Sequence, residues 1–336
     1  MELTTIWFLV IAFLWVGYFV LEGFDFGVGA LLPVLARNDR ERRVMINTIG
    51  PVWDGNEVWL LVAGGATFAA FPEWYATLFS GFYLPLLLIL LALIVRGLAF
   101  EYRHKRPEDS WKRNWDLAII VGSVVPAVLW GVAFANIVAG VPIDADFEFT
   151  GSIFTLLNPY GLLGGVTMLL LCVTHGAMFV ALKTDGEIRH RARLLAVRVG
   201  AVTFVVAGGF WTWTQTAHGS LASAPVLVAA ALALLGALLA AASGREGWAF
   251  TGTFAAIGLM MVGLFTALFP DVMPSSTDPA YSLTVTNAAA TQYTLRIMTW
   301  VAVAFTPIVL GYQAWSYWVF RRRLTVEHIS ADAPAR

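Results

Sequence analysis

The chain has 336 residues, of which 59% are hydrophobic and only 13% are Asp, Glu, Lys or Arg. A soluble protein of this length carries more charge, so the composition excludes a soluble enzyme or a nucleic-acid-binding protein. The formal net charge is −1, and the single cysteine, Cys172, can form neither an internal disulfide nor a thiolate metal cluster. The composition predicts one integral membrane domain over residues 1–336, with no large soluble domain.

Apolar runs of about 20 residues, the length that crosses a bilayer core, recur along the chain. They predict an all-α fold with nine transmembrane helices. The first run lacks the basic start and the cleavage site of a signal peptide, so we expect it to remain as an uncleaved signal anchor. The predicted spans lie near residues 6–35, 52–71, 75–100, 116–140, 158–182, 195–215, 224–243, 248–269 and 292–320.

Basic residues gather in alternate connections between these spans. The segments after the first, third, fifth, seventh and ninth spans read ARNDRERRVM, EYRHKRPEDSWKRNW, KTDGEIRHRARLLAVR, SGREG and RRRLTVEH. The opposite connections, such as 140–151 and 270–287, are acidic or uncharged. Because Lys and Arg accumulate on the cytoplasmic side, the pattern predicts an outer N-terminus and a cytoplasmic C-terminus. An even number of spans would break this alternation.

Charged residues inside the spans are few and costly to insert, at roughly 2.5–3.5 kcal/mol for an Asp at a helix centre. Glu22 and Asp25 lie three residues apart in the first span, and therefore on one face of the helix. Gly23 and Gly27 point roughly the other way, as a small-residue pair suited to close helix packing. One face of this helix is thus predicted to pack tightly and the other to present acids.

More charged groups cluster at the same depth. Asp54 and Glu57 open the second span, and Arg96 and then Glu101 end the third. Because the first span runs inward in the predicted orientation, these groups and the acids of the first span share the cytoplasmic half of the membrane. The sequence predicts a cytoplasm-facing acidic pocket here.

Structural and functional interpretations of these acids compete. Asp54 could cap the second helix, because Asp is favoured at the N-cap and suits a helix N-terminus. Asp25 lies in mid-helix and could instead form a buried ion pair with Arg96. Glu22 could be a polar contact between helices. The functional alternative is a proton relay, since buried carboxyls can exchange protons.

One histidine, His175, lies well inside a span, while the other four histidines fall in connections or the tail. A haem ligand is one interpretation of such a residue. However, no second buried histidine is available for a bis-His site, so an interhelical hydrogen bond is favoured. The residues alone therefore predict a helical membrane subunit that binds no haem and no metal by itself.

Four stretches carry a family resemblance. They read GFDFGVG (23–29), NDRERRVMINTIGPVWDGNEVWLLVAGGATFAAFP (38–72), FSGFYLPLLLILLALIVRGLAFEYR (79–103) and HGA (175–177). They closely resemble subunit II of the cytochrome bd quinol oxidases. The likeness covers the whole length in span count and loop placement, and beyond about residue 185 it rests mainly on topology.

The resemblance implies a heterodimer with a similarly folded subunit I, which carries haem d, two haems b and the quinol-oxidising loop. Such a complex, a quinol:oxygen oxidoreductase of aerobic respiration, reduces dioxygen to water in the bacterial cytoplasmic membrane. It is electrogenic without pumping, because its chemical protons come from the cytoplasm. Lipids surround it, and some members hold a structural quinone or a small single-span accessory subunit. No motif here decides either of these, or excludes the cyanide-insensitive variant.

The resemblance also implies roles for individual residues. Asp54 matches the Asp of the family's WDGN motif, which belongs to a proton path toward haem d, and Asp25 matches a family acid associated with that path. Arg96 matches a family arginine by its place before the EYR sequence. The family accepts Asp or Glu at Glu22. We therefore expect Asp25, Asp54, Glu57 and Glu22 to form the proton path, and Arg96 and Glu101 to be the buried charge partners.

Two hypotheses from other classes stay open at the level of sequence. The chain could be a stand-alone proton-coupled transporter that uses Asp25, Asp54 and Arg96. It could also be a purely structural scaffold in which Arg96 neutralises the acids. Co-purification of a haem-bearing polypeptide in mild detergent would discriminate between these readings and the oxidase subunit.

Overall fold

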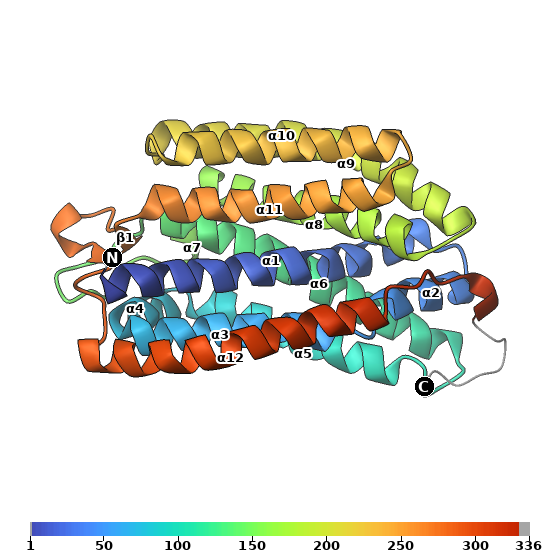
Figure 1. The fold of residues 1–336 in the computed structure, drawn as a ribbon, viewed down its shortest axis with the longest axis horizontal. Helices are drawn as coiled ribbons and strands as arrows, with labels where there is room; N and C mark the ends of the chain where they lie inside the picture. The colour runs from blue at the N-terminus through green and yellow to red at the C-terminus, as the bar shows by residue number, and fades with distance from the viewer. Residues whose placement is uncertain (1, 329–336) are drawn as a thin grey trace.

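The structure, a computed structural model, describes residues 2–328 as long helices that run side by side in a bundle (Figure 1). The longer helices are α1 (Leu3–Leu35), α2 (Asp39–Ile49), α3 (Trp53–Ala70), α4 (Pro72–Gly81), α5 (Tyr83–Tyr102), α6 (Asp109–Ala139), α8 (Pro159–Lys183), α9 (Glu187–Ala217), α10 (Ser223–Ala242), α11 (Glu246–Leu268) and α12 (Gln292–Val319). The short elements are α7 (Ile153–Leu156), the strands β1 (Asp271–Met273) and β2 (Leu283–Thr284), and the 3₁₀ helices Pro279–Tyr281 and Val326–His328.

Within the described residues, eight helices are long and apolar enough to cross a membrane: α1, α5, α6, α8, α9, α10, α11 and α12. The helix at the second predicted span, α3, is not among them. It has 18 residues, and its first turns carry Asp54, Asn56 and Glu57. A multi-pass helical membrane protein is therefore confirmed, while the count of nine spans stays a prediction.

The third predicted span, 75–100, is wrong as a single helix. The structure breaks it into α4 and α5 at Phe82, which has a non-helical backbone. Pro85 explains the break, because a proline lacks the N–H that bonds four residues back and its ring clashes with that carbonyl, here of Gly81. Similarly, α3 ends at Ala70, and the next residue, Phe71, has a non-helical backbone with φ −135°, because the following Pro72 disfavours the helical conformation there.

The first basic connection also differs from the prediction, since residues that were expected to form a loop form α2. Asn38 caps this helix by accepting a hydrogen bond from the backbone N–H of Glu41. One stripe of α2 is buried, including Val44, Met45 and Ile49. The helix lies beside the end of α1, at the end of the bundle opposite to α4 (Figure 1). It thereby sets the position of the N-terminus of α3.

Two apolar cores follow each other along the bundle, and polar residues separate them. On α5, Leu93 belongs to one core and Ala99 to the other, with Arg96 between them. On α3, Asn56 likewise lies between the two cores. The buried polar residues of this boundary layer are Glu22, Asp25, Asn56, Arg96, Ser123, Thr174, His175, Thr203 and Thr253.

The contact between α1 and α8 confirms half of the predicted small-residue pair. A Cβ atom at Gly27 would overlap the backbone carbonyl of Cys172 and approach the Cα of Gly176 to 2.8 Å. A Cβ at Gly23 would find its nearest neighbour, the Cys172 Sγ, at an ordinary 3.7 Å. Of the predicted pair, only Gly27 is therefore required for the close approach of the two backbones, and it meets Gly176 of α8, where a Cβ would overlap the Gly27 carbonyl carbon.

The C-terminal transmembrane helix, α12, lies at the edge of the bundle, and of its residues only Leu295 is buried. Near its start, the Trp7 indole N–H donates to the carbonyl of Leu295 and to the Thr299 hydroxyl, both at 3.1 Å. Near its end, Gln313 and Tyr317 reach α3. Between these two contacts, α1, α3 and α12 enclose an apolar groove of about 690 Å³.

Candidate functional site

The centre of the boundary layer is a buried guanidinium with two carboxylates. Arg96 belongs to the buried face of α5, a stripe that also contains Ile89, Leu93 and Ala99. Its Nη2 donates to Oε1 of Glu22, which is equally buried, and to Oε2 of Glu57 at 3.3 Å. The Glu57 side chain is 24% exposed, so this acid links the buried pair to the surface.

Close packing fixes the position of Arg96. The Phe26 ring lies 4.7 Å from the guanidinium carbon, within the range of a cation–π contact. A Cβ at Gly122 of α6 would come within 2.6 Å of the Arg96 Cβ. The absence of a side chain at Gly122 thus lets α5 approach α6 closely enough to bury the arginine.

The predicted partners of Arg96 need correction. We expected Arg96 to pair with Asp25 or Glu101, but the structure pairs it with Glu22 and Glu57. Glu101 is exposed, because it lies more than a helical turn beyond Arg96, off the buried stripe of α5. Acids of α1 and α3 do come together, as predicted, because Glu22 and Glu57 both pair with Arg96.

The partner of Asp25 is an amide rather than an ion. Asn56 of α3 donates from Nδ2 to Oδ2 of Asp25 at 2.7 Å, and both side chains are fully buried. The Asn56 Oδ1 accepts hydrogen bonds from the Tyr317 hydroxyl at 2.7 Å and from Gln313 Nε2 at 3.0 Å. Asp25 is therefore tied to α12 through α3.

Asp54 lies outside this buried group, exposed in the first turn of α3. Val52 occupies the N-cap position, so the structural alternative in which Asp54 caps the helix does not hold in that form, since Asp54 lies two positions further on. The Asp54 carboxylate does accept a hydrogen bond from the neighbouring Gly55 N–H at 2.7 Å. Negative charge in the first helical turn is still favourable. Its place on the surface suits a group that exchanges protons with water.

The sequence interpretation gave no role to Asn56, Gln313 or Tyr317. A signal for Asn56 was present, because it falls on the stripe of α3 that buries Trp59 and Ala63 at helical spacing. A buried amide needs hydrogen-bond partners, and Asp25 is one of them. No local pattern could indicate Gln313 and Tyr317, which lie more than 250 residues away along the chain.

Four polar atoms of the group have no hydrogen-bond partner within the described protein: Glu22 Oε2, Asp25 Oδ1, Arg96 Nε and Arg96 Nη1. An unsatisfied buried polar atom costs about 1–3 kcal/mol, and more when it is charged. Water molecules bonded to these four atoms would remove that cost, and they would also bring water to both carboxyl groups. The arrangement is chemically suited to taking up and releasing protons.

His175 forms the interhelical hydrogen bonds that we expected. Its Nδ1 lies 2.6 Å from the Thr253 hydroxyl of α11, and its Nε2 lies 3.2 Å from the Val20 carbonyl of α1. Both ring nitrogens are thus engaged, so this histidine does not fit an axial haem ligand. The described residues also contain no group of three His, Cys, Asp or Glu side chains that could hold a metal ion.

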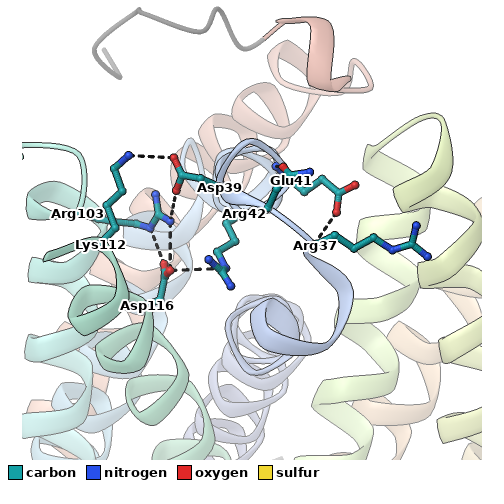
Figure 2. Close-up of polar contacts among 8 residues, drawn as sticks. Arg37, Asp39, Glu41, Arg42, Arg103, Lys112 and Asp116 are labelled. Carbon is teal, nitrogen blue, oxygen red and sulfur yellow. Dashed lines mark hydrogen bonds and ion pairs between the residues drawn. The ribbon is translucent and has the colours of Figure 1, made fainter. Parts of the chain in front are cut away.

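A second charged group holds α2 against the bundle (Figure 2). Arg103, the residue directly after α5, bonds to both carboxylate oxygens of Asp116 on α6, at 2.5 and 3.2 Å. It also bonds to Asp39 of α2 at 2.7 Å, and Lys112 and Arg42 complete the group. The cluster ties the start of α2 to the end of α5 and the start of α6.

The charge balance in this cluster lowers the pKa of Asp39. Partial burial acts to raise that pKa, but the hydrogen bonds and positive charges of Arg103 and Lys112 outweigh it. A carboxylate with a lowered folded pKa stabilises the fold above its unfolded pKa of about 3.9. This stabilisation is lost as the pH falls through the lowered value, so the cluster is intact at neutral pH.

The predicted cytoplasmic segments gather at this same end of the bundle. Glu41 of α2 bonds to Arg191 of α9 at 2.7 Å. Glu246, at the start of α11, bonds to Arg189 at 2.9 Å and lies 4.0 Å from Arg323, beyond α12. Segments that are far apart in the sequence but share basic residues thus meet through ion pairs.

Comparison with known proteins agrees with this architecture. Residues 3–320 match the family model described as cytochrome bd terminal oxidase subunit II. The chain is 44% identical to cytochrome bd ubiquinol oxidase subunit 2 of Bacillus subtilis, over 96% of this chain and 97% of that protein. It is 40% identical to cytochrome bd-I ubiquinol oxidase subunit 2 of Escherichia coli, over 97% and 96%.

A solved structure shares the fold. A chain of the bd oxidase from Geobacillus thermodenitrificans superposes with a TM-score of 0.77, covering 95% of this chain and 99% of that one, at 17% sequence identity. At that identity the likeness concerns the fold alone. The family match and the identities over nearly the whole chain go further, and they show that this chain belongs to the family of subunit II of the cytochrome bd terminal oxidases.

Proposed function

We propose that this chain is the subunit of a bd-type quinol oxidase that supports assembly and leads cytoplasmic protons toward the site of dioxygen reduction. Reduction of dioxygen to water consumes protons, and no water-filled pathway crosses an apolar bundle without polar groups to line it. The observation that carries the proposal is the buried group of Glu22, Glu57 and Arg96, with Asp25 beside it. It lies between two apolar cores, where acids are costly without a function.

The order of exposure suggests the direction of transfer. Asp54 is exposed, Glu57 is partly exposed, and Glu22 and Asp25 are fully buried. The basic segments beside α2 support a cytoplasmic location of this end under the positive-inside rule. Protons would enter at Asp54, pass Glu57 and reach the inner acids. This path requires α3 to be the ninth spanning helix, with the N-terminus outside and the C-terminus cytoplasmic.

The haems, in this proposal, belong to the partner subunit I. They would supply the electron transfer and the dioxygen chemistry, with quinol as the reductant. Support comes from His175, whose two nitrogens are both hydrogen-bonded within the chain. The scaffold hypothesis explains Glu22 and Glu57, which both pair with Arg96, but it leaves Asp25 without a cation.

Asp54→Asn tests the relay. The side-chain oxygen of Asn can still accept the hydrogen bond from the Gly55 N–H, so the exchange preserves local structure while removing the exchangeable carboxyl proton. We expect oxygen consumption with quinol to fall by about a hundredfold or more, the range that positioned proton transfer contributes. The complex should keep its full haem content, measured by its absorbance spectrum.

Asp109→Asn is the matched control, because Asp109 is also exposed in the first turn of a helix at this end of the bundle. It should leave oxygen consumption unchanged. If the Asp54 variant has normal oxygen consumption and a normal haem content, Asp54 has only a structural role. The relay would then depend on Asp25 alone.

A further inference from the structure

Asn56 makes more hydrogen bonds within the boundary layer than a packing residue needs. It donates to Asp25 Oδ2 at 2.7 Å and more weakly to the Leu21 carbonyl at 3.4 Å. It accepts from Tyr317 and Gln313 of α12. Its side chain is fully buried, so none of these partners can be replaced by bulk water. The amide therefore has a full set of partners in one orientation.

That orientation has a chemical consequence for Asp25. The two donors from α12 face the amide oxygen, so the amide N–H group faces the carboxylate. A side-chain amide is a poor proton carrier, because it has no readily exchanged proton at neutral pH. Asn56 thus occupies Oδ2 of Asp25, while Oδ1, which is buried and has no partner in the described chain, stays available.

We propose that Asn56 is a positioning residue that orients Asp25 for proton transfer through Oδ1, and that Tyr317 and Gln313 hold Asn56 in place. This inference rests on the proposed relay. The proposal also gives α12 a role, because this helix has few other contacts with the bundle. The position of α12 against α3 would determine how Asn56, and through it Asp25, is oriented. The competing explanation is that Asn56 only satisfies buried polar groups, in which case its loss would affect stability alone.

Asn56→Asp separates the two explanations. The new carboxyl has nearly the same shape and can still accept from Tyr317 and Gln313. It places a second acid within hydrogen-bond distance of Asp25, and two carboxyls that close share a proton. The pair would release that proton only at a higher pH than Asp25 alone. The pH profile of oxygen consumption should therefore move to higher pH by at least about one unit.

Asn136→Asp is the matched control. Asn136 is 2% exposed, and its amide also donates two hydrogen bonds and accepts one, from Asn158. Its recorded hydrogen-bond partners are backbone carbonyls and an amide. We expect this variant to leave the pH profile in place even if it lowers the yield of the complex.

Three measurements on the purified complex decide the matter: haem content, oxygen consumption against pH, and the activity of Asp25→Asn. A shift in Asn56→Asp alone supports the inference, whereas no shift, or an equal shift in Asn136→Asp, overturns it. If Asn56→Asp does not assemble, Tyr317→Phe replaces it. This variant removes one donor to Asn56 and should shift the profile less, in the same direction, while an unchanged profile overturns the inference.

Asp25→Asn distinguishes failure of the inference from failure of the proposed function. Full activity in Asp25→Asn would refute the relay through Asp25, and the positioning role with it. Loss of activity in Asp25→Asn together with an unshifted Asn56→Asp profile would refute the positioning role alone.

Discussion

At the scale of single residues, Arg96 dominates the electrostatics of the bundle. A guanidinium in an apolar interior loses its hydration, and only close carboxylates and hydrogen bonds repay that loss. Glu22 and Glu57 supply them, and the Phe26 ring adds a weaker attraction. The arginine in turn makes it tolerable to bury Glu22. Each of these groups is stable in the layer only because the others are present.

Arg96→Leu should therefore prevent stable assembly. The substitution leaves Glu22 buried without its cation, a loss of about 3–5 kcal/mol for one partner of a buried pair. The expected result is a strong reduction in assembled, haem-containing complex, measured spectroscopically in membranes. Arg106→Leu is the control, because Arg106 is exposed and lies over the Trp111 ring. Normal assembly and turnover of the Arg96 variant would show that the pairing is wrong.

At the scale of elements, close backbone contact sets the arrangement of α1 and α8. Where two helices meet through glycine, an added methyl group forces the backbones apart, and overpacking typically costs about 1–3 kcal/mol. Because Glu22 and Asp25 lie on α1 near this contact, its geometry also determines where the acids lie. The ion pairs of Arg103 with Asp39 and Asp116 similarly hold α2 in place.

Gly27→Ala and Gly23→Ala form a matched pair that tests the first contact. The former places a Cβ against the Cys172 carbonyl, and the latter places one in ordinary van der Waals contact with the Cys172 Sγ. We expect Gly27→Ala to lower the temperature of thermal unfolding of the complex by several degrees, since about 1–3 kcal/mol is lost. Gly23→Ala should be close to neutral. Equal effects would mean that α1 and α8 can separate freely.

Asp116→Asn tests the ion pairs that hold α2. Arg103 is 4% exposed and would lose its bidentate carboxylate, although Asp39 remains. The cost should be smaller than the roughly 3–5 kcal/mol of an isolated buried pair. Limited proteolysis should show faster cleavage near α2 in this variant than in Asp109→Asn, and similar cleavage in both would argue against a role for the cluster.

At the scale of the whole molecule, the proposed function asks the chain for the polar groups of a proton path and for a surface that meets other components. The described helices expose many apolar side chains, above all on α12, and lipid or a partner subunit would cover them. If the redox centres belong to that partner, the two functions are divided between the chains.

Expressed alone, the chain should therefore show no haem Soret absorbance in membranes. The reason is that the one histidine inside a predicted span, His175, already uses both of its nitrogens. Co-expression with subunit I should restore the haem spectrum, which serves as the positive control. A haem retained in a one-to-one ratio by the isolated chain would contradict the proposed division.

The sequence by itself determined the class of the protein. Long apolar runs permit few structures in a bilayer other than helices, and the alternation of basic connections follows from their cost of translocation. The sequence also indicated which acids would share one depth, because positions along a spanning helix translate directly into depth. Glu22, Glu57 and Arg96 were identified for this reason.

The tertiary structure decided which of these groups touch. Arg96 could have paired with any acid at its depth, and the rotation of α5 against α1 and α3 selected Glu22 and Glu57 rather than Asp25 or Glu101. The contacts of Asn56 with Gln313 and Tyr317 join the second predicted span to the last. Such contacts form between helices that are hundreds of residues apart in the sequence. The periodic pattern of one helix shows which face is buried, but it does not identify the helix that packs against that face.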